Sequence, residues 1–184
     1  MAAAAPLLQN DGLASGQAAT VLGVLSEGYT PTGKIEGAGD QRVSMVPEVA
    51  ASLAKDGYQV VVETGVGTYA GITDEAYVAA GCQVVSRSQV IQKGQVLFSI
   101  EPPVRDFGSM RGNVLVSWVG RLLDKGKAIV SRATECGLTL IDVTAVPRIT
   151  IAQKLDVLSS QAKVAGHRAV VEATHVYGRF HTAE

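Results

Sequence analysis

Short runs of β-branched residues recur along this chain, and segments with helical spacing separate them. Two clear examples are Tyr58–Glu63 and Asn113–Val116, in which valine recurs at adjacent or nearly adjacent positions. Because such runs are apolar on both sides, they suit strands buried on both faces of a parallel sheet. Since strand and helix patterns alternate from Ala19 to Val146, the sequence predicts an α/β domain with a mainly parallel sheet and helices on both faces.

Turn and capping residues place the elements of this domain. We expect strands at Ala19–Ser26, Tyr58–Glu63, Gln83–Val85, Gln95–Ile100, Asn113–Val116 and Leu138–Val143. We expect helices from Pro47 to Gly57, from an N-cap at Thr73 to Gly81, between Val85 and Gln95, and through Ile129 and Ala133 to Gly137. The stretch from Tyr29 to Gln41, rich in glycine, is the expected loop after the first strand.

The chain divides into three parts by composition and periodicity. Residues 1–18 show no hydrophobic periodicity, so we expect a flexible lead-in. Residues 19–150 carry the alternating elements of the α/β domain. Residues 151–184 hold a polar loop and then an apolar stripe at steps of three and four, which predicts a long helix beginning near Ser159. A helix of about 20 to 28 residues is about 30 to 40 Å long, so we expect it to link this domain to another.

Charge and hydropathy exclude several classes of partner. Lys and Arg total 16 against 17 Asp and Glu, so a net charge of -1 offers no basic surface for nucleic acid or an anionic membrane. Mean hydropathy is +0.21, yet no apolar run approaches the ~18 residues of a spanning helix, so we expect no direct membrane insertion by this segment. The cysteines and histidines lack the spacing of a metal site, and we expect no metal.

A glycine-rich turn, Gly65–Gly71, follows an expected strand and precedes a helix, as a dinucleotide-binding fingerprint does. That fingerprint also has an acidic residue about 20 positions further on, which accepts a hydrogen bond from the ribose. The corresponding stretch, Gln83–Gln89, contains no acidic residue. We therefore interpret the glycines as a tight turn at the end of a strand, where a positive φ angle costs them little.

Polar residues gather after the last expected strand, in the segment Val146–Gln161. Four of them fall within a short stretch: Arg148, Gln153, Asp156 and Ser159. Arginine offers fixed donors for a ribose or phosphate, and Asp, Gln and Ser complement both ends of a carboxamide, so the set suits a nicotinamide head group. A solvated face on which Asp156 or Ser159 caps the following helix explains the same residues, and spacing alone leaves both interpretations open.

This segment closely resembles the alpha component of the proton-translocating NAD(P) transhydrogenases. The resemblance runs through Val146–Gln153, Asp156–Ala162 and Ala165–Ala173, and it takes in Asp40–Val43 and Val62–Gly67. It implies the Rossmann-like N-terminal domain of the alanine dehydrogenase and transhydrogenase family. It also implies that Arg148, Gln153, Asp156 and Ser159 contact the dihydronicotinamide ring and its ribose, with Gln153 and Asp156 orienting the ring for catalysis.

The resemblance implies an oxidoreductase in which hydride passes directly from NADH on this component to NADP⁺ on a partner component. The two nicotinamides carry that chemistry, while the protein contributes orientation, approach distance and water exclusion. A transmembrane component couples the transfer to proton translocation, so this segment is expected to be a peripheral part of a membrane-bound enzyme. Its expected place is the bacterial cytoplasmic side, or the mitochondrial matrix or organelle side in a eukaryote, as a homodimer.

The family's NAD-binding Rossmann domain is expected to begin after Glu184 and is absent from this chain. The glycines that hold the cofactor's pyrophosphate belong to that domain. We therefore expect the chain alone to carry half of the NAD(H) site and to be inactive by itself.

Two other functions fit the same fold. Alanine dehydrogenases are similar in this region, but they use a lysine just before a Glu-Pro pair and a histidine in the next strand for substrate. Here Ile100 precedes Glu101–Pro102, and Ser117–Val119 contains no histidine, which argues against amino-acid oxidation. A non-catalytic dimerisation module is the third interpretation. Arg42 lies where the dehydrogenases bind a substrate carboxylate, and either a remnant of that site or a salt bridge closing the preceding loop explains it.

Overall fold

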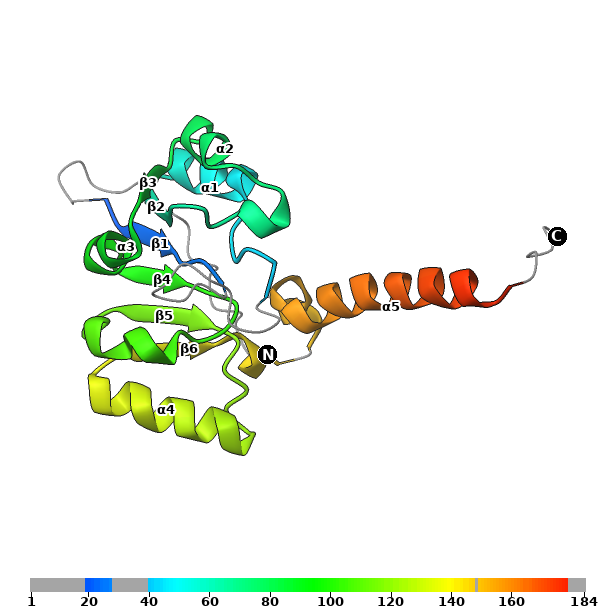
Figure 1. The fold of residues 1–184 in the computed structure, drawn as a ribbon. Helices are drawn as coiled ribbons and strands as arrows, with labels where there is room; N and C mark the ends of the chain where they lie inside the picture. Colours follow the sequence, from blue (N-terminus) through cyan, green and yellow to red (C-terminus); the bar gives the residue numbers. More distant parts are fainter. Residues whose placement is uncertain (1–18, 28–39, 148, 179–184) are drawn as a thin grey trace, which may run out of the picture.

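A computed structural model describes residues 19–27, 40–147 and 149–178 (Figure 1). At the centre of this part of the chain is a six-stranded sheet in which all neighbouring strands are parallel. The strands are β1 (Val21–Val24), β2 (Gln59–Glu63), β3 (Gln83–Val85), β4 (Val96–Phe98), β5 (Val114–Ser117) and β6 (Thr139–Asp142). The α/β prediction is confirmed, and each strand falls on a run that the sequence predicts. The predicted lead-in and the loop from Tyr29 to Gly39 lie outside the described residues.

The strand order, β3-β2-β1-β4-β5-β6, means that β1 lies inside the sheet and that the side on which strands are added switches once, which we call the strand reversal. It adds β2 and β3 on one side of β1, and then returns to place β4 on the other side of β1. In open parallel sheets, such a reversal creates a crevice at the carboxyl ends of the strands, where ligands bind. The fold therefore points to the carboxyl ends of β1 and β4 as the place to look for a site.

Helices cover both faces of the sheet and enclose two apolar cores. On one face, α1 (Pro47–Lys55) and α2 (Asp74–Ala79) pack over β2 and β3. The other face is covered by α3 (Arg87–Lys93), the 3₁₀ helix η2 (Val104–Ser109) and α4 (Asp124–Cys136). Neighbouring positions of β2 enter different cores, since Val60 and Val62 pack beneath α1 and α2 while Val61 packs on the opposite face. This double burial explains why β2 is apolar at successive positions.

Among the described elements, α1 and α2 cover only part of this face of the sheet. The strand register aligns Val24, Phe98, Val116 and Ile141 in one row across β1, β4, β5 and β6. Val24 is fully buried, Phe98 and Val116 are half-buried, and Ile141 is 50% exposed. Exposure therefore rises with distance from α1 and α2, which leaves an apolar surface beside the strand reversal.

Local sequence signals are reflected in the turns and helix starts. Thr73 caps α2 as predicted, because its hydroxyl oxygen accepts a hydrogen bond from the amide of Ala76 (3.4 Å). Gly65 and Gly71 both have φ angles of 74°, and the chain between them forms the short 3₁₀ helix η1 (Thr68–Ala70). The interpretation of this segment as a tight turn agrees with that geometry.

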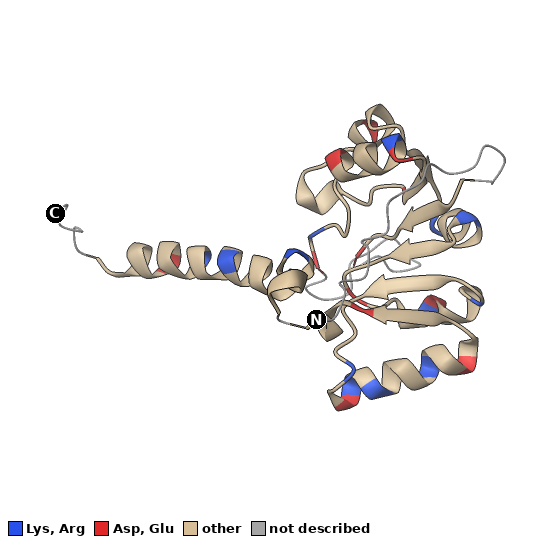
Figure 2. Ribbon diagram, turned by 180° about the vertical axis from the view of Figure 1, so that it is seen from behind, with Lys and Arg blue, Asp and Glu red and all other residues tan. Residues whose placement is uncertain are grey.

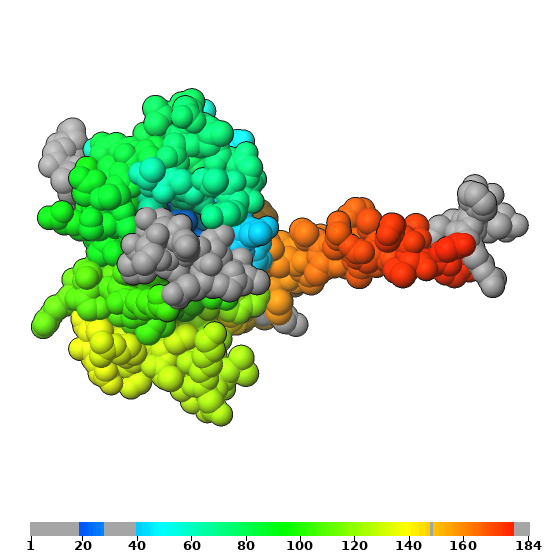
Figure 3. All heavy atoms as spheres, viewed as in Figure 1, coloured from blue at the N-terminus to red at the C-terminus, as the bar shows by residue number. Residues whose placement is uncertain are grey.

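The last described element, α5 (Val157–Val176), projects away from the sheet (Figures 1 and 3). The predicted start near Ser159 is two residues late, because Asp156 supplies the N-cap and the helix begins directly after it. Apolar side chains along the helix are exposed, and Val170 and Val176 are 65% and 78% exposed. The long helix is confirmed, and its apolar stripe is available to a partner.

The described residues also bear on the expected partners. None of their helices combines the length and apolar character needed to cross a bilayer. Within the same residues, no group of three or more His, Cys, Asp or Glu side chains is arranged to hold a metal ion. Charged residues of both signs are spread over the helices (Figure 2).

Candidate functional site

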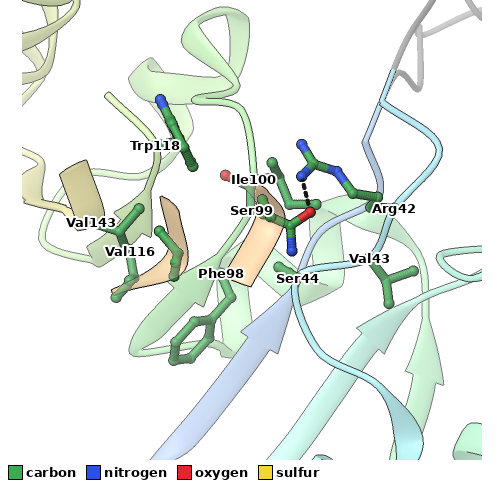
Figure 4. A pocket seen from close by; sticks show the side chains of 11 residues that line it. Arg42, Val43, Ser44, Phe98, Ser99, Ile100, Val116, Trp118 and Val143 are labelled. Carbon is green, nitrogen blue, oxygen red and sulfur yellow. Dashed lines mark hydrogen bonds between the residues drawn. The ribbon is translucent and has the colours of Figure 1, made fainter. Parts of the chain in front are cut away.

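A cavity of about 320 Å³ lies at the carboxyl ends of β4 and β5, beside the strand reversal (Figure 4). Most of its wall is apolar and comes from Phe98, Ile100, Val116, Trp118, Val143 and Val157. Its polar groups belong to Arg42, Ser44, Ser99 and Gln161. An adjoining cavity of about 420 Å³ shares Arg42, Ile100, Trp118 and Gln161 with the first. Apolar walls with a few converging polar groups are typical of a small-molecule site.

Arg42 joins the segment before α1 to the first turns of α5. Its Nε donates to Asp40 Oδ1 (2.9 Å) and its Nη2 to Asp40 Oδ2 (2.5 Å), while its Nη1 donates to Gln161 Oε1 (2.7 Å). The hydrogen bonds from Arg42 hold the pKa of Asp40 below its usual value. All three guanidinium nitrogens already donate, so the salt-bridge interpretation of Arg42 agrees with the structure, and the contact with Gln161 adds an anchor for α5.

Two serines place hydroxyl groups at the smaller cavity. The Ser44 hydroxyl oxygen is buried and has no hydrogen-bond partner among the described residues. Ser99 is 5% exposed, and its hydroxyl donates to the Ser117 hydroxyl (3.3 Å), which donates in turn to the Ile100 carbonyl (3.0 Å). A buried polar atom without a partner is uncommon, so the Ser44 hydroxyl is available to a polar group that enters the cavity.

A buried carboxylate lies just after β1. Glu27 is 6% exposed and accepts hydrogen bonds from the backbone amides of Ile100 (2.5 Å) and Glu101 (3.0 Å). Burial raises its pKa from 4.5 to about 7, although the two amide hydrogen bonds lower it. Because the folded chain holds this proton more tightly than the unfolded chain does, ionisation of Glu27 costs folding free energy as the pH rises from about 4.5 to about 7.

A partly buried ion cluster holds the backbone that carries Glu27. Arg87 donates to Glu63 Oε2 (2.8 Å) and to Asp106 Oδ2 (2.8 Å), and its Nη1 also reaches the Ser26 carbonyl (3.2 Å). The Ser26 amide donates to Glu63 Oε2 (2.8 Å). Burial raises the pKa of Glu63 even though the charge of Arg87 lowers it. The cluster therefore ties the ends of β1 and β2 to the start of α3 and to η2.

Asp142, at the end of β6, organises the loop after β5. One carboxylate oxygen accepts from the amides of Val119 (3.1 Å) and Gly120 (3.3 Å), and the other accepts from the amide of Arg121 (3.0 Å). Thr144 donates to the first oxygen from both its amide and its hydroxyl. Burial pushes the pKa of Asp142 up, but these hydrogen bonds outweigh it and hold the pKa below its usual value.

Substituting Asp142 with asparagine is expected to destabilise the chain by about 1 to 3 kcal/mol at neutral pH, because an amide NH₂ would face the Arg121 amide. The lowered pKa stabilises the fold above the unfolded value of about 3.8, and this contribution is lost as the pH falls through the folded value. Urea unfolding at neutral pH and at about pH 2.5 should show the difference shrinking in acid. Asp124→Asn, at a 98% exposed side chain, is the control, and an equal effect of the two variants would contradict this role.

Of the four residues predicted to bind nicotinamide, the structure describes three. Arg148 lies outside the described residues. Gln153 is exposed on the 3₁₀ helix η4 (Thr150–Leu155). Asp156 caps α5 by accepting from the amides of Leu158 (3.0 Å) and Ser159 (3.3 Å), and it also accepts from the Ser159 hydroxyl (2.6 Å). The structure thus brings Asp156 and Ser159 together as the capping interpretation expected, while Gln153 remains free to face a ligand.

Sequence reasoning missed Glu27, Asp142 and Gln161. The first two directly follow or end strands at the carboxyl edge of the sheet, so an acidic residue next to an apolar run was the available signal. Gln161 carried no such signal, because its contact with Arg42 spans 119 positions of sequence.

Comparison with known proteins gives consistent results. Residues 36–165 match the family described as alanine dehydrogenase/PNT, N-terminal domain. The NAD(P) transhydrogenase subunit alpha of Cereibacter sphaeroides is 38% identical over 149 residues, which cover 79% of this chain and 28% of that protein. The NAD(P) transhydrogenase subunit alpha of Haemophilus influenzae is 32% identical over 147 residues, covering 79% of this chain and 28% of that protein.

A solved structure is similar as well. The crystal structure of the transhydrogenase from Sinorhizobium meliloti matches with a TM-score of 0.75 and 30% identity, over 86% of this chain and 45% of that chain. The chain spans less than half the length of each of these relatives. Because residues 36–165 make up more than two thirds of the sequence, the chain belongs to the alanine dehydrogenase/PNT N-terminal domain family.

Proposed function

We propose that this chain is the front part of the NAD(H)-binding component of a proton-translocating NAD(P) transhydrogenase. In this role, the loop before α5 orients the dihydronicotinamide ring for hydride transfer. The observation that carries the proposal is that the start of α5, directly after this loop, is seated at the strand reversal, where Val157 and Gln161 line the smaller cavity. The similarity to transhydrogenase alpha subunits supports the same conclusion.

In the proposed reaction the protein has to position the two nicotinamide rings, and it needs no general acid or base. Hydride transfer needs the donor carbon held at about 3 to 3.5 Å from its acceptor, in a place from which water is excluded. The exposed amide of Gln153 offers both a donor and an acceptor to the carboxamide of the ring. We assign Asp156 and Ser159, whose side chains meet at the start of α5, to the ring and its ribose together with Gln153, and Arg148 to the same group.

The lining of the smaller cavity disfavours amino-acid oxidation. Among the described residues that line it there is neither lysine nor histidine, and Ile100 and Trp118 occupy the wall. Arg42, the residue expected to pair with a substrate carboxylate, is already bound to Asp40 and Gln161. A dehydrogenase acting on an amino acid needs a group that removes a proton.

The remaining parts of the reaction belong to other segments. The pyrophosphate of NAD(H) is held by a nucleotide-binding domain, NADP(H) binds a partner component, and a transmembrane component moves the proton. We propose that the chain works as a homodimer in a peripheral position on that membrane-bound enzyme, on the cytoplasmic side in bacteria or the matrix or organelle side in a eukaryote. The exposed apolar stripe of α5 supports contact with such a neighbour, since surfaces of this kind are usually covered in the assembly.

The chain alone is expected to bind NADH more weakly than micromolar. In the proposed enzyme, the helix N-terminus that cradles the pyrophosphate belongs to the nucleotide-binding domain. Most of the affinity for a dinucleotide comes from such contacts away from the nicotinamide ring. Isothermal titration calorimetry of residues 1–184 with NADH measures this directly. Micromolar or tighter binding would show that the division of the site between two segments is wrong.

A chimera tests the function itself. Residues 1–184 replace the matching segment of the Cereibacter sphaeroides subunit alpha, and NADH-dependent reduction of an NADP analogue is followed by absorbance in the presence of the partner components. The chimera is expected to transfer hydride, because its front segment supplies the ring-orienting loop. A chimera that folds and binds NADH but transfers no hydride would refute the proposal.

A further inference from the structure

Glu27 joins the two strands that flank the strand reversal. It lies just after the end of β1, and it accepts hydrogen bonds from the amides of Ile100 and Glu101, in the loop after β4. Ile100 lines both cavities, and Glu101 lines the larger one. A single buried carboxylate therefore sets the position of one wall of the crevice.

The other side of this wall is held by β5. The Ile100 carbonyl accepts from the backbone amide of Trp118 (2.9 Å) and from the hydroxyl of Ser117 (3.0 Å). Trp118 lines both cavities and is the one tryptophan of the sequence. A shift of the Ile100 peptide changes the surroundings of this indole, which makes its fluorescence a built-in probe of the wall.

Charged groups on the elements packed around Glu27 define its electrostatic setting. Asp40 and Arg42 face it from the segment before α1, and Glu101 faces it from the loop after β4. Behind it, the Arg87 cluster binds both the amide and the carbonyl of Ser26. The backbone beside Glu27 is thus held by partly buried ion pairs, so a change at the carboxylate is transmitted to the Ile100–Glu101 peptide.

We propose that Glu27 is a positioning residue that holds the Ile100–Glu101 wall of the crevice when ionised and loosens it when protonated. An ionised carboxylate offers acceptors to both amides, and such charge-assisted hydrogen bonds are about twice as strong as neutral ones. Protonation turns one of these oxygens into a hydroxyl, which is a donor and a poorer acceptor, so the hydrogen bond from one amide weakens. The raised pKa, about 7, places this exchange near neutral pH. The inference builds on the proposed ring-binding role of the crevice, but its test needs no nucleotide.

The test is a fluorescence titration of Trp118 in the chain as it stands. The emission of wild type is expected to change between about pH 5.5 and pH 8.5, with a midpoint near 7. Glu27→Gln, which mimics the protonated form, should give a flat profile at the acid-side value of wild type. Glu101→Gln is the matched control: it should keep the transition but move the midpoint down, because the charge of Glu101 raises the pKa of Glu27.

A second measurement on wild type covers the case in which Glu27→Gln does not fold. Hydrogen exchange of the Ile100 and Glu101 amides, followed by NMR and corrected for intrinsic rates, should show protection falling about two- to tenfold on acidification through the same midpoint. The amide of Leu97 within β4 should not change. A flat wild-type fluorescence profile, a transition that persists in Glu27→Gln, or unchanged protection at both amides would overturn the proposal. These two experiments measure the crevice wall alone, whereas the chimera measures hydride transfer. Failure of the proposed function can therefore be distinguished from failure of the role proposed for Glu27.

Discussion

Replacing Gln153 with alanine is expected to slow hydride transfer about a hundredfold in the chimera, while NADH binding weakens by about tenfold or less. The amide of Gln153 acts on the ring, and a displacement of the ring by about 1 Å is enough for a loss of that size. Affinity comes mainly from the adenosine and pyrophosphate contacts of the nucleotide-binding domain. Single-turnover hydride transfer beside a direct binding titration separates the two effects.

Neighbouring substitutions sharpen this experiment. Lys154→Ala, on the same exposed 3₁₀ helix, should leave both measurements near the parent value. Asp156→Ala should slow transfer and also destabilise the start of α5 by about 1 kcal/mol, because its carboxylate is the N-cap. Arg148→Ala should lower both rate and affinity, since a guanidinium anchors ribose or phosphate. Transfer at the parent's rate by Gln153→Ala would mean that the loop shares only its fold with the family.

The largest loss of stability is expected from Arg87→Met, which should lower the free energy of unfolding by about 3 to 5 kcal/mol. The substitution leaves Glu63, whose side chain is 4% exposed, as a buried carboxylate without its cation. It also removes the donor to the Ser26 carbonyl, so the end of β1 loses one of its fixed contacts. Urea unfolding followed by circular dichroism measures the effect.

Two controls separate a buried pair from an ordinary one. Adding Glu63→Gln to Arg87→Met should recover part of the loss, because the uncompensated charge is removed. Arg132→Met breaks the pair with Glu135, in which both side chains are more than half exposed, and should cost at most about 1 kcal/mol. If Arg87→Met is no more damaging than Arg132→Met, the cluster does not hold the strand ends together.

The strands could be predicted because their signal is local. Val60, Val61 and Val62 follow one another since both faces of β2 are buried, and the position of Thr73 marks a helix start through its own hydroxyl. Each of these features can be recognised from residues that are adjacent in the sequence. The start of α5 was harder to place: Asp156 and Ser159 both carry capping oxygens, and only the backbone geometry selects Asp156.

The site was harder to predict because its contacts are distant in sequence. Glu27 meets Ile100 across 73 positions, and Arg42 meets Gln161 across 119. No periodicity encodes such pairs, which exist only because the strand reversal brings their elements together. The resemblance of the loop from Val146 to Gln161 to a known family supplied what spacing could not, namely a reason to prefer a ligand over a solvated face.

Because α5 projects from the crevice, a small rotation at its base produces a larger displacement at its far end. Its 20 residues make α5 about 30 Å long, so a tilt of only about 5° at the base carries the far end through about 2.6 Å. The base is seated by Val157 at the cavity wall and by the bond between Arg42 and Gln161. A fraction of an ångström gained or lost under those two contacts is therefore amplified severalfold at the far end of the helix.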